Sequence, residues 1–107
     1  MSESFTISST PHAAFGALVA LSLPPQPMRR FTREEASIVA RALAAVARGA
    51  SSERQVYMSP IASDQDFDAR VGDNGLAVTA EGFSEIALDW TETRMLAEAL
   101  ARAGGVA

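Results

Sequence analysis

Hydrophobic and polar residues alternate through much of the second half of the chain. Two turn signals, Asp73-Asn74-Gly75 and Glu81-Gly82, divide this part into alternating segments. A period of two is typical of strands with one buried face, and Asn-Gly favours a tight hairpin because both residues accept positive φ. We therefore predict a meander of strands at residues 67–71, 76–80 and 84–90.

Two other segments place apolar residues three or four positions apart, the spacing of a helix with one buried face. The first follows Thr32, which stands three residues before Glu35 as in a capping box, and Gly49 marks its end. The second follows Thr91, the predicted N-cap, and ends at Gly104. Ion pairs between residues four apart are expected on its outer face, namely Arg94–Glu98 and Glu98–Arg102.

The first third of the chain is less regular. Residues 4–8 alternate like a short strand, and residues 11–23 fit two interpretations. Thr10-Pro11 favours a helix start, whereas apolar side chains at every second position from 15 to 23 favour a strand. We favour the strand, because the apolar run is short and ends at a proline. Residues 55–61 predict a further strand that ends at Pro60 or lies at a sheet edge.

These segments together predict one α+β domain spanning residues 1–107, a common domain size. The expected order is β-β-α-β-β-β-β-α, with an antiparallel sheet of about five to six short strands and two helices packed on one face. The second face of this sheet is then either exposed to solvent or covered by another protein. Because apolar strands such as residues 13–23 are poorly suited to a solvated face, a homodimer is one expected outcome.

The composition restricts the class of protein. The chain has no cysteine, which excludes disulfides and thiolate zinc sites, and its first residues lack the basic leader of a secretory signal. The longest apolar run, residues 13–23, is shorter than the about 20 residues that cross a bilayer. We therefore expect a soluble, cytoplasmic protein.

Charge is distributed unevenly along the chain. Residues 1–54 contain six arginines and four acidic residues, a net charge of +2, whereas residues 55–107 contain three arginines and nine acidic residues, a net charge of −6. An acidic half repels nucleic acid and acidic membrane surfaces and attracts basic surfaces. We therefore expect a protein partner with a basic surface, with no direct binding to nucleic acid or membranes.

Residues suited to catalysis or metal binding are few. His12 is the only histidine, and no nucleophile-elbow motif surrounds the serines beside it. Asp64-x-Asp66-x-Asp68 has the spacing that opens a calcium loop, yet Ala69 and Gly75 occupy the positions that need glycine and glutamate. We predict no catalytic residue, no metal site and no cofactor.

One small basic cluster, Arg29-Arg30-Phe31-x-Arg33, surrounds an aromatic residue. Such clusters can contact phosphates and stack on a base. Glu34 and Glu35 follow directly, however, and Phe31 is explained more simply as a hydrophobic staple at the start of a helix. This cluster does not change the expectation of a protein partner.

The combined pattern predicts a small, acidic, non-enzymatic binding or regulatory protein. It would act through protein–protein contact, for example as an inhibitor that offers acidic side chains to a basic groove. The alternatives are a structural subunit of a homo-oligomer, and a small ligand-binding protein or hydrolase that uses His12. The expected partner-binding residues are Asp64, Asp66, Asp68, Asp73, Glu81 and Glu85.

Overall fold

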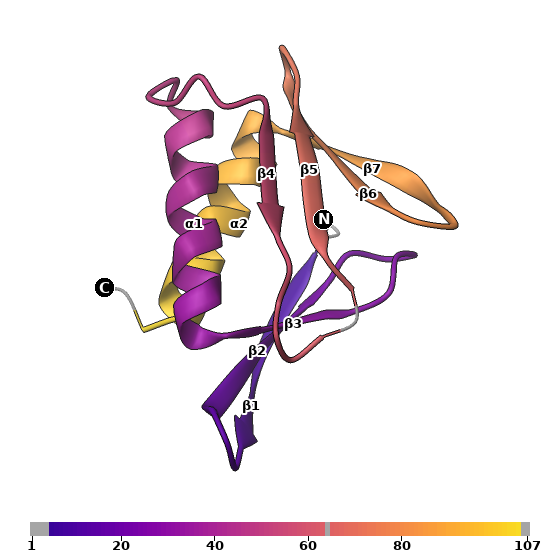
Figure 1. Ribbon diagram of the computed structural model, residues 1–107. Helices are drawn as coiled ribbons and strands as arrows, with labels where there is room; N and C mark the ends of the chain where they lie inside the picture. Colours follow the sequence, from indigo (N-terminus) through magenta and orange to yellow (C-terminus); the bar gives the residue numbers. More distant parts are fainter. Residues whose placement is uncertain (1–4, 64, 106–107) are drawn as a thin grey trace.

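The computed structural model describes residues 5–63 and 65–105, which form seven strands and two helices (Figure 1). In chain order the elements are β1 (Thr6–His12), β2 (Gly16–Ser22), β3 (Arg29–Thr32), α1 (Arg33–Ala47), β4 (Gln55–Met58), β5 (Phe67–Val71), β6 (Gly75–Ala80), β7 (Phe83–Asp89) and α2 (Trp90–Ala103). The predicted order is confirmed, with β3 as an additional strand directly before α1. No helix in the described part of the chain is long and apolar enough to cross a membrane.

The strands form two antiparallel sheets, so the prediction of a single sheet of five to six strands is wrong. One sheet has the order β1-β2-β3, and the other is the meander β4-β5-β6-β7. β3 is the last strand of the first sheet, and the chain passes from it directly into α1 before the second sheet begins. The α+β class with two helices is confirmed.

The ambiguous segment at residues 11–23 is extended, as its alternation favours, and it contains a hairpin turn. β1 and β2 pair along their whole length, from Thr6–Ser22 at one end to His12–Gly16 at the turn. The fully buried residues at the end of this segment are Val19, Leu21 and Leu23. This hairpin therefore contributes one face of β2 to the core.

The predicted hairpin between β5 and β6 is confirmed, and it depends on glycine. Gly75 has a φ of 152°, and a Cβ at this position would lie 1.9 Å from the Leu88 carbonyl oxygen. Only glycine permits this close approach of β6 to β7. No non-glycine residue in the described ranges has positive φ, so Asn74 does not adopt the left-handed conformation that the prediction assumed.

Both helices begin with a capping box. Thr32 and Glu35 exchange the predicted pair of hydrogen bonds at the start of α1. At the start of α2 the N-cap is Asp89: its carboxylate accepts from the Glu92 N–H at 2.8 Å, and Glu92 accepts from the Asp89 N–H at 3.0 Å. The prediction of Thr91 as N-cap is wrong, because the residue before it is already helical.

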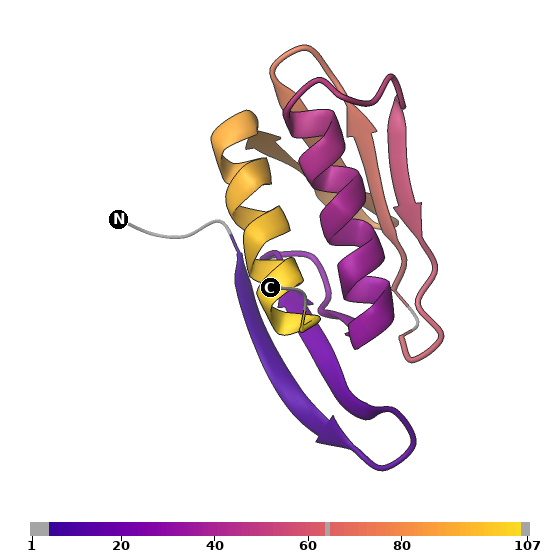
Figure 2. The same ribbon diagram turned by 90° about the vertical axis from the view of Figure 1, so that its left-hand side faces the viewer.

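The two helices lie side by side, and elements of both sheets pack against them (Figures 1 and 2). Phe31 from the first sheet and Phe67 from the second meet edge to face in the core, with ring centroids 6.4 Å apart. The outer face of the four-stranded sheet instead carries exposed side chains, among them Tyr57, Arg70 and Glu85. This exposed face holds most of the acidic residues that the sequence singles out.

Candidate functional site

The fold brings three of the predicted acidic residues together. Asp66, Asp68 and Glu81 line one hollow of about 240 Å³, at the end of the sheet where β5 begins and the β6–β7 turn lies. Tyr57 from β4 and Thr79 from β6 also line this hollow. We call it the acidic hollow. Asp64, which was also predicted to bind the partner, lies outside the described residues.

Asp73 and Glu85 do not line the acidic hollow. Asp73 lies in the β5–β6 turn, at the opposite end of the sheet from Glu81, because successive turns of a meander alternate between the two ends (Figure 1). The Asp73 carbonyl accepts a hydrogen bond from the Trp90 indole at 3.2 Å. Glu85 forms an ion pair with Arg70 at 2.5 Å, which neutralises its charge.

Charges on the outer face of α2 are arranged differently from the sequence-based expectation. The predicted ion pairs Arg94–Glu98 and Glu98–Arg102 do not form, although all three residues lie in the described part of the chain. Arg94 instead makes a long contact of 3.4 Å with the Thr91 hydroxyl. In the acidic hollow, Asp66 and Asp68 accept hydrogen bonds from Tyr57 and Gln55, and none of its three carboxylates forms an ion pair with a described residue.

Tyr57 was not among the predicted contact residues, although it is 54% exposed beside the hollow. Its hydroxyl donates a hydrogen bond to Asp66 Oδ2 at 2.5 Å. This hydrogen bond, followed by desolvation and the Asp66 charge, raises the pKa of Tyr57, because the ionised phenol would face a carboxylate. The signal in the sequence is alternation: Tyr57 stands between the inward-facing Val56 and Met58.

Arg29 packs behind the hollow and contacts two of the residues that line it. Its side chain is fully buried, so it does not share a surface cluster with the exposed Arg30. Nε donates to the Asp66 carbonyl at 2.7 Å, and Nη2 donates to the Thr79 carbonyl at 3.2 Å. Burial lowers the pKa of Arg29, and the Asp66 carboxylate partly opposes that change.

Gln26 completes the connection between the two sheets. Its buried Nε2 donates to the carbonyls of Val78 at 2.9 Å and Ser84 at 3.0 Å, while its Oε1 accepts from Arg29 at 2.8 Å. The β6–β7 register shifts between Val78 and Ala80, and such irregularities leave main-chain groups unpaired within the ladder. Gln26 and Arg29 supply donors there, which fixes this end of the sheet.

His12 has a structural environment at the β1–β2 turn. Its Nδ1 accepts hydrogen bonds from the main-chain N–H groups of Ala14 at 3.1 Å and Phe15 at 3.2 Å. The imidazole also stacks on the Phe15 ring, with centroids 5.0 Å apart. These contacts give the side chain a role in stabilising the turn.

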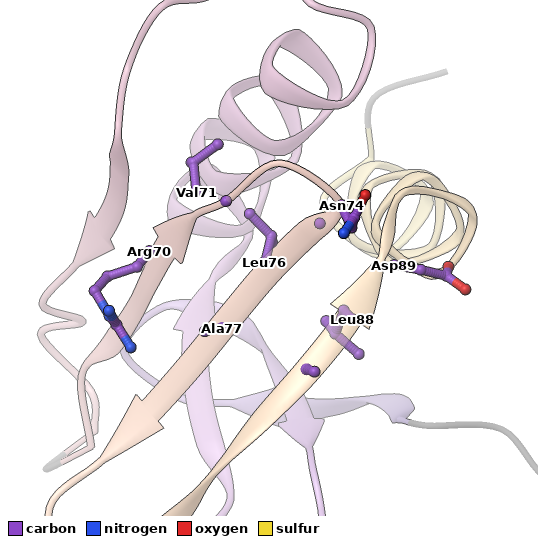
Figure 3. A pocket seen from close by; sticks show the side chains of 10 residues that line it. Arg70, Val71, Asn74, Leu76, Ala77, Leu88 and Asp89 are labelled. Carbon is purple, nitrogen blue, oxygen red and sulfur yellow. The ribbon is translucent and has the colours of Figure 1, made fainter.

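A larger hollow, of about 360 Å³, lies near the β5–β6 turn (Figure 3). Its walls include Leu76 and Leu88 from two neighbouring strands. Its charged residues are already engaged elsewhere, because Arg70 pairs with Glu85 and Asp89 caps α2. The acidic hollow has three carboxylates without an ion pair among the described residues, and it is therefore the better candidate for recognition of a basic group.

Within the described ranges, no group of three histidine, aspartate or glutamate side chains could hold a metal ion. Comparison with models of known protein families, with curated proteins and with solved structures finds no match to this chain. The acidic hollow and its surroundings are thus the basis for assigning a function.

Proposed function

We propose that this protein is a non-enzymatic binding protein that docks on a basic surface of another protein. The supporting observation is the convergence of Asp66, Asp68 and Glu81 around one hollow beside the exposed Tyr57. Carboxylates accept strong hydrogen bonds from arginine and lysine, and tyrosine is a frequent anchor in interfaces. A regulator or inhibitor of a protein with a basic groove would act in this way, and a cysteine-free chain suits the reducing cytoplasm.

A basic partner fits this surface better than a second copy of the chain does. Two copies related by a two-fold axis through the hollow would present the same patch to each other. Asp66, Asp68 and Glu81 would then face their own counterparts, and opposed like charges destabilise an interface. We therefore propose a different protein as the partner at this face, in preference to a homodimer.

Affinity capture from the native host, identification of the captured protein and titration of the purified pair test this proposal. The double variant Asp68→Asn/Glu81→Gln removes two charges of the hollow and leaves the Tyr57–Asp66 hydrogen bond in place. We expect the affinity for the partner to fall at least about tenfold, and binding of the native protein to weaken as salt increases.

The matched control is Glu34→Gln/Glu98→Gln, which removes the same charge from exposed positions on the two helices. Its affinity should stay within about twofold of the native value, because distant surface charges are largely screened. Equal losses in the two double variants would show that only net charge matters, and would contradict the proposal. Binding that is insensitive to salt, or a captured protein with an acidic contact surface, would contradict it as well.

A further inference from the structure

β4 forms an open edge of the four-stranded sheet (Figure 2). Immediately before this strand, the Val71 N–H donates to the Arg54 carbonyl at 2.8 Å. Arg54 and Val71 therefore form a hydrogen-bonded pair. Such pairs alternate with non-hydrogen-bonded pairs along an antiparallel ladder, so the main-chain groups of every second residue of β4, starting with the residue after Arg54, point away from β5. The main-chain N–H and C=O groups of Gln55 and Tyr57 therefore point away from β5, toward the open edge.

A hollow of about 330 Å³ adjoins the same edge, between β4 and α1. Ala42 and Val46 of α1 form its apolar wall, and Val56 of β4 also lines it. Among the described residues that line it, Glu53 is the only charged one. The hollow is therefore suited to small apolar side chains that enter from the edge of the sheet.

An added strand at β4 would alternate between two different environments, because successive side chains of a strand point to opposite faces. Residues opposite Gln55 and Tyr57 would lie on the outer face, near the Tyr57 ring and the carboxylates of Asp66 and Asp68. A residue opposite Val56 would point into the hollow beside α1. The first environment favours basic side chains, and the second favours small apolar ones.

We propose that the partner docks as an extended segment of alternating basic and small apolar residues, which adds an antiparallel fifth strand at β4. This inference rests on the proposed function and specifies the form that the basic partner takes. The added strand is short, since β4 has four residues and Pro60 follows soon after it. The β4 strand of a second copy does not fit this pattern, because its outward-facing residues are Gln55 and Tyr57, which carry no positive charge.

A fluorescein-labelled nonapeptide of alternating arginine and valine, with blocked ends, is a direct probe. In the antiparallel arrangement the arginine residues make the main-chain hydrogen bonds to Gln55 and Tyr57, while the valine N–H groups point away from β4. One matched peptide therefore carries N-methyl groups on the arginine amides, and the other carries them on the valine amides. Fluorescence anisotropy with the native protein compares all three peptides.

The unmodified peptide should bind with a Kd below about 1 mM. Methylation of the arginine amides should weaken binding at least about tenfold, and methylation of the valine amides should change it less than about threefold. Hydrogen exchange gives a second readout: the amides of Gln55 and Tyr57 should exchange rapidly in the free protein and slow when the peptide is bound, while the Val56 amide is slow in both states.

Equal effects of the two methylations, the reverse order, or no binding of the unmodified peptide would overturn the added-strand inference. The proposed function has its own test, because Asp68→Asn/Glu81→Gln should still weaken capture of the natural partner. If that variant weakens capture and the methylation pattern is absent, only the added strand is refuted. If the peptide follows the methylation pattern but binds the double variant with native affinity, the edge is a docking site and the role of the acidic hollow is refuted.

Discussion

Replacement of Arg29 by methionine tests whether a buried guanidinium connects the two sheets. The change removes hydrogen bonds to Asp66, Gln26 and Thr79, which measure 2.7, 2.8 and 3.2 Å. Each buried acceptor that loses its donor costs about 1–3 kcal/mol. Part of this loss is offset, because Nη1 of Arg29 is buried without a partner among the described residues and its desolvation is no longer required. We expect the free energy of unfolding to fall by about 2–4 kcal/mol.

Urea denaturation followed by fluorescence of Trp90, the only tryptophan, measures this change. With an m-value of about 2 kcal/mol/M, the transition midpoint should fall by about 1–2 M. Arg30→Met is the matched control, because Arg30 is the next residue of β3 and is exposed. Its effect should stay below about 0.5 kcal/mol. Equal midpoints for the two variants would refute the reasoning.

The remaining predictions concern a titration, a turn and a helix cap. Absorbance should show that Tyr57 ionises above the usual tyrosine pKa of about 10, and that the Asp66→Asn variant brings its pKa closer to that usual value. The stability from the Tyr57–Asp66 hydrogen bond is present below about pH 10 and is lost as the pH rises through the raised pKa of Tyr57. Gly75→Ala should lose at least about 2 kcal/mol in urea denaturation, and native stability would contradict the positive φ. Asp89→Ala should lose about 1 kcal/mol and Thr91→Ala much less; the opposite order would restore Thr91 as N-cap.

Elements that depend on neighbouring residues could be predicted from the sequence. The capping box of α1 requires only Thr32 and Glu35, three positions apart, and both hydrogen bonds form. The β5–β6 hairpin requires a glycine at its turn, and Gly75 provides it. In both cases the residues that signal the element lie close together in the chain, although the contact that requires glycine at position 75 is made with Leu88 of β7. Local chemistry is then sufficient to place the element.

β3 could not be predicted in this way, because its inward-facing residues include a charged one. Charged side chains are almost never fully buried unless they are paired, so Arg29 reads as a surface residue. Its acceptors, the carbonyls of Asp66 and Thr79, lie 37 and 50 residues further along the chain. The same long-range hydrogen bonds connect the first sheet to the second. The sequence alone gives no signal for these contacts, apart from the two-residue spacing that places Arg29 on the same strand face as Phe31.

The candidate site was predictable in part. The predicted meander already implies that the turns carrying Asp73 and Glu81 lie at opposite ends of the sheet, so these two residues could have been separated from the sequence alone. The ion pair between Arg70 and Glu85 could not be predicted from the sequence, because the two residues lie two strands apart. The residue paired with Arg70 on the intervening strand is the small Ala77. Side-chain reach across a strand depends on the final register and twist, which the alternation of residues does not specify.

Arg29 also relates the stability of the fold to the geometry of the acidic hollow. Its hydrogen bonds hold the main chain of Asp66, just before β5, and of Thr79 in β6, and both residues line the hollow. Arg29→Met and Arg30→Met each remove one positive charge, so charge alone predicts that both variants bind the arginine–valine peptide slightly more tightly. Loss of preorganised geometry predicts weaker binding for Arg29→Met only, under conditions where both variants are folded. The direction of the change in affinity therefore separates the two effects.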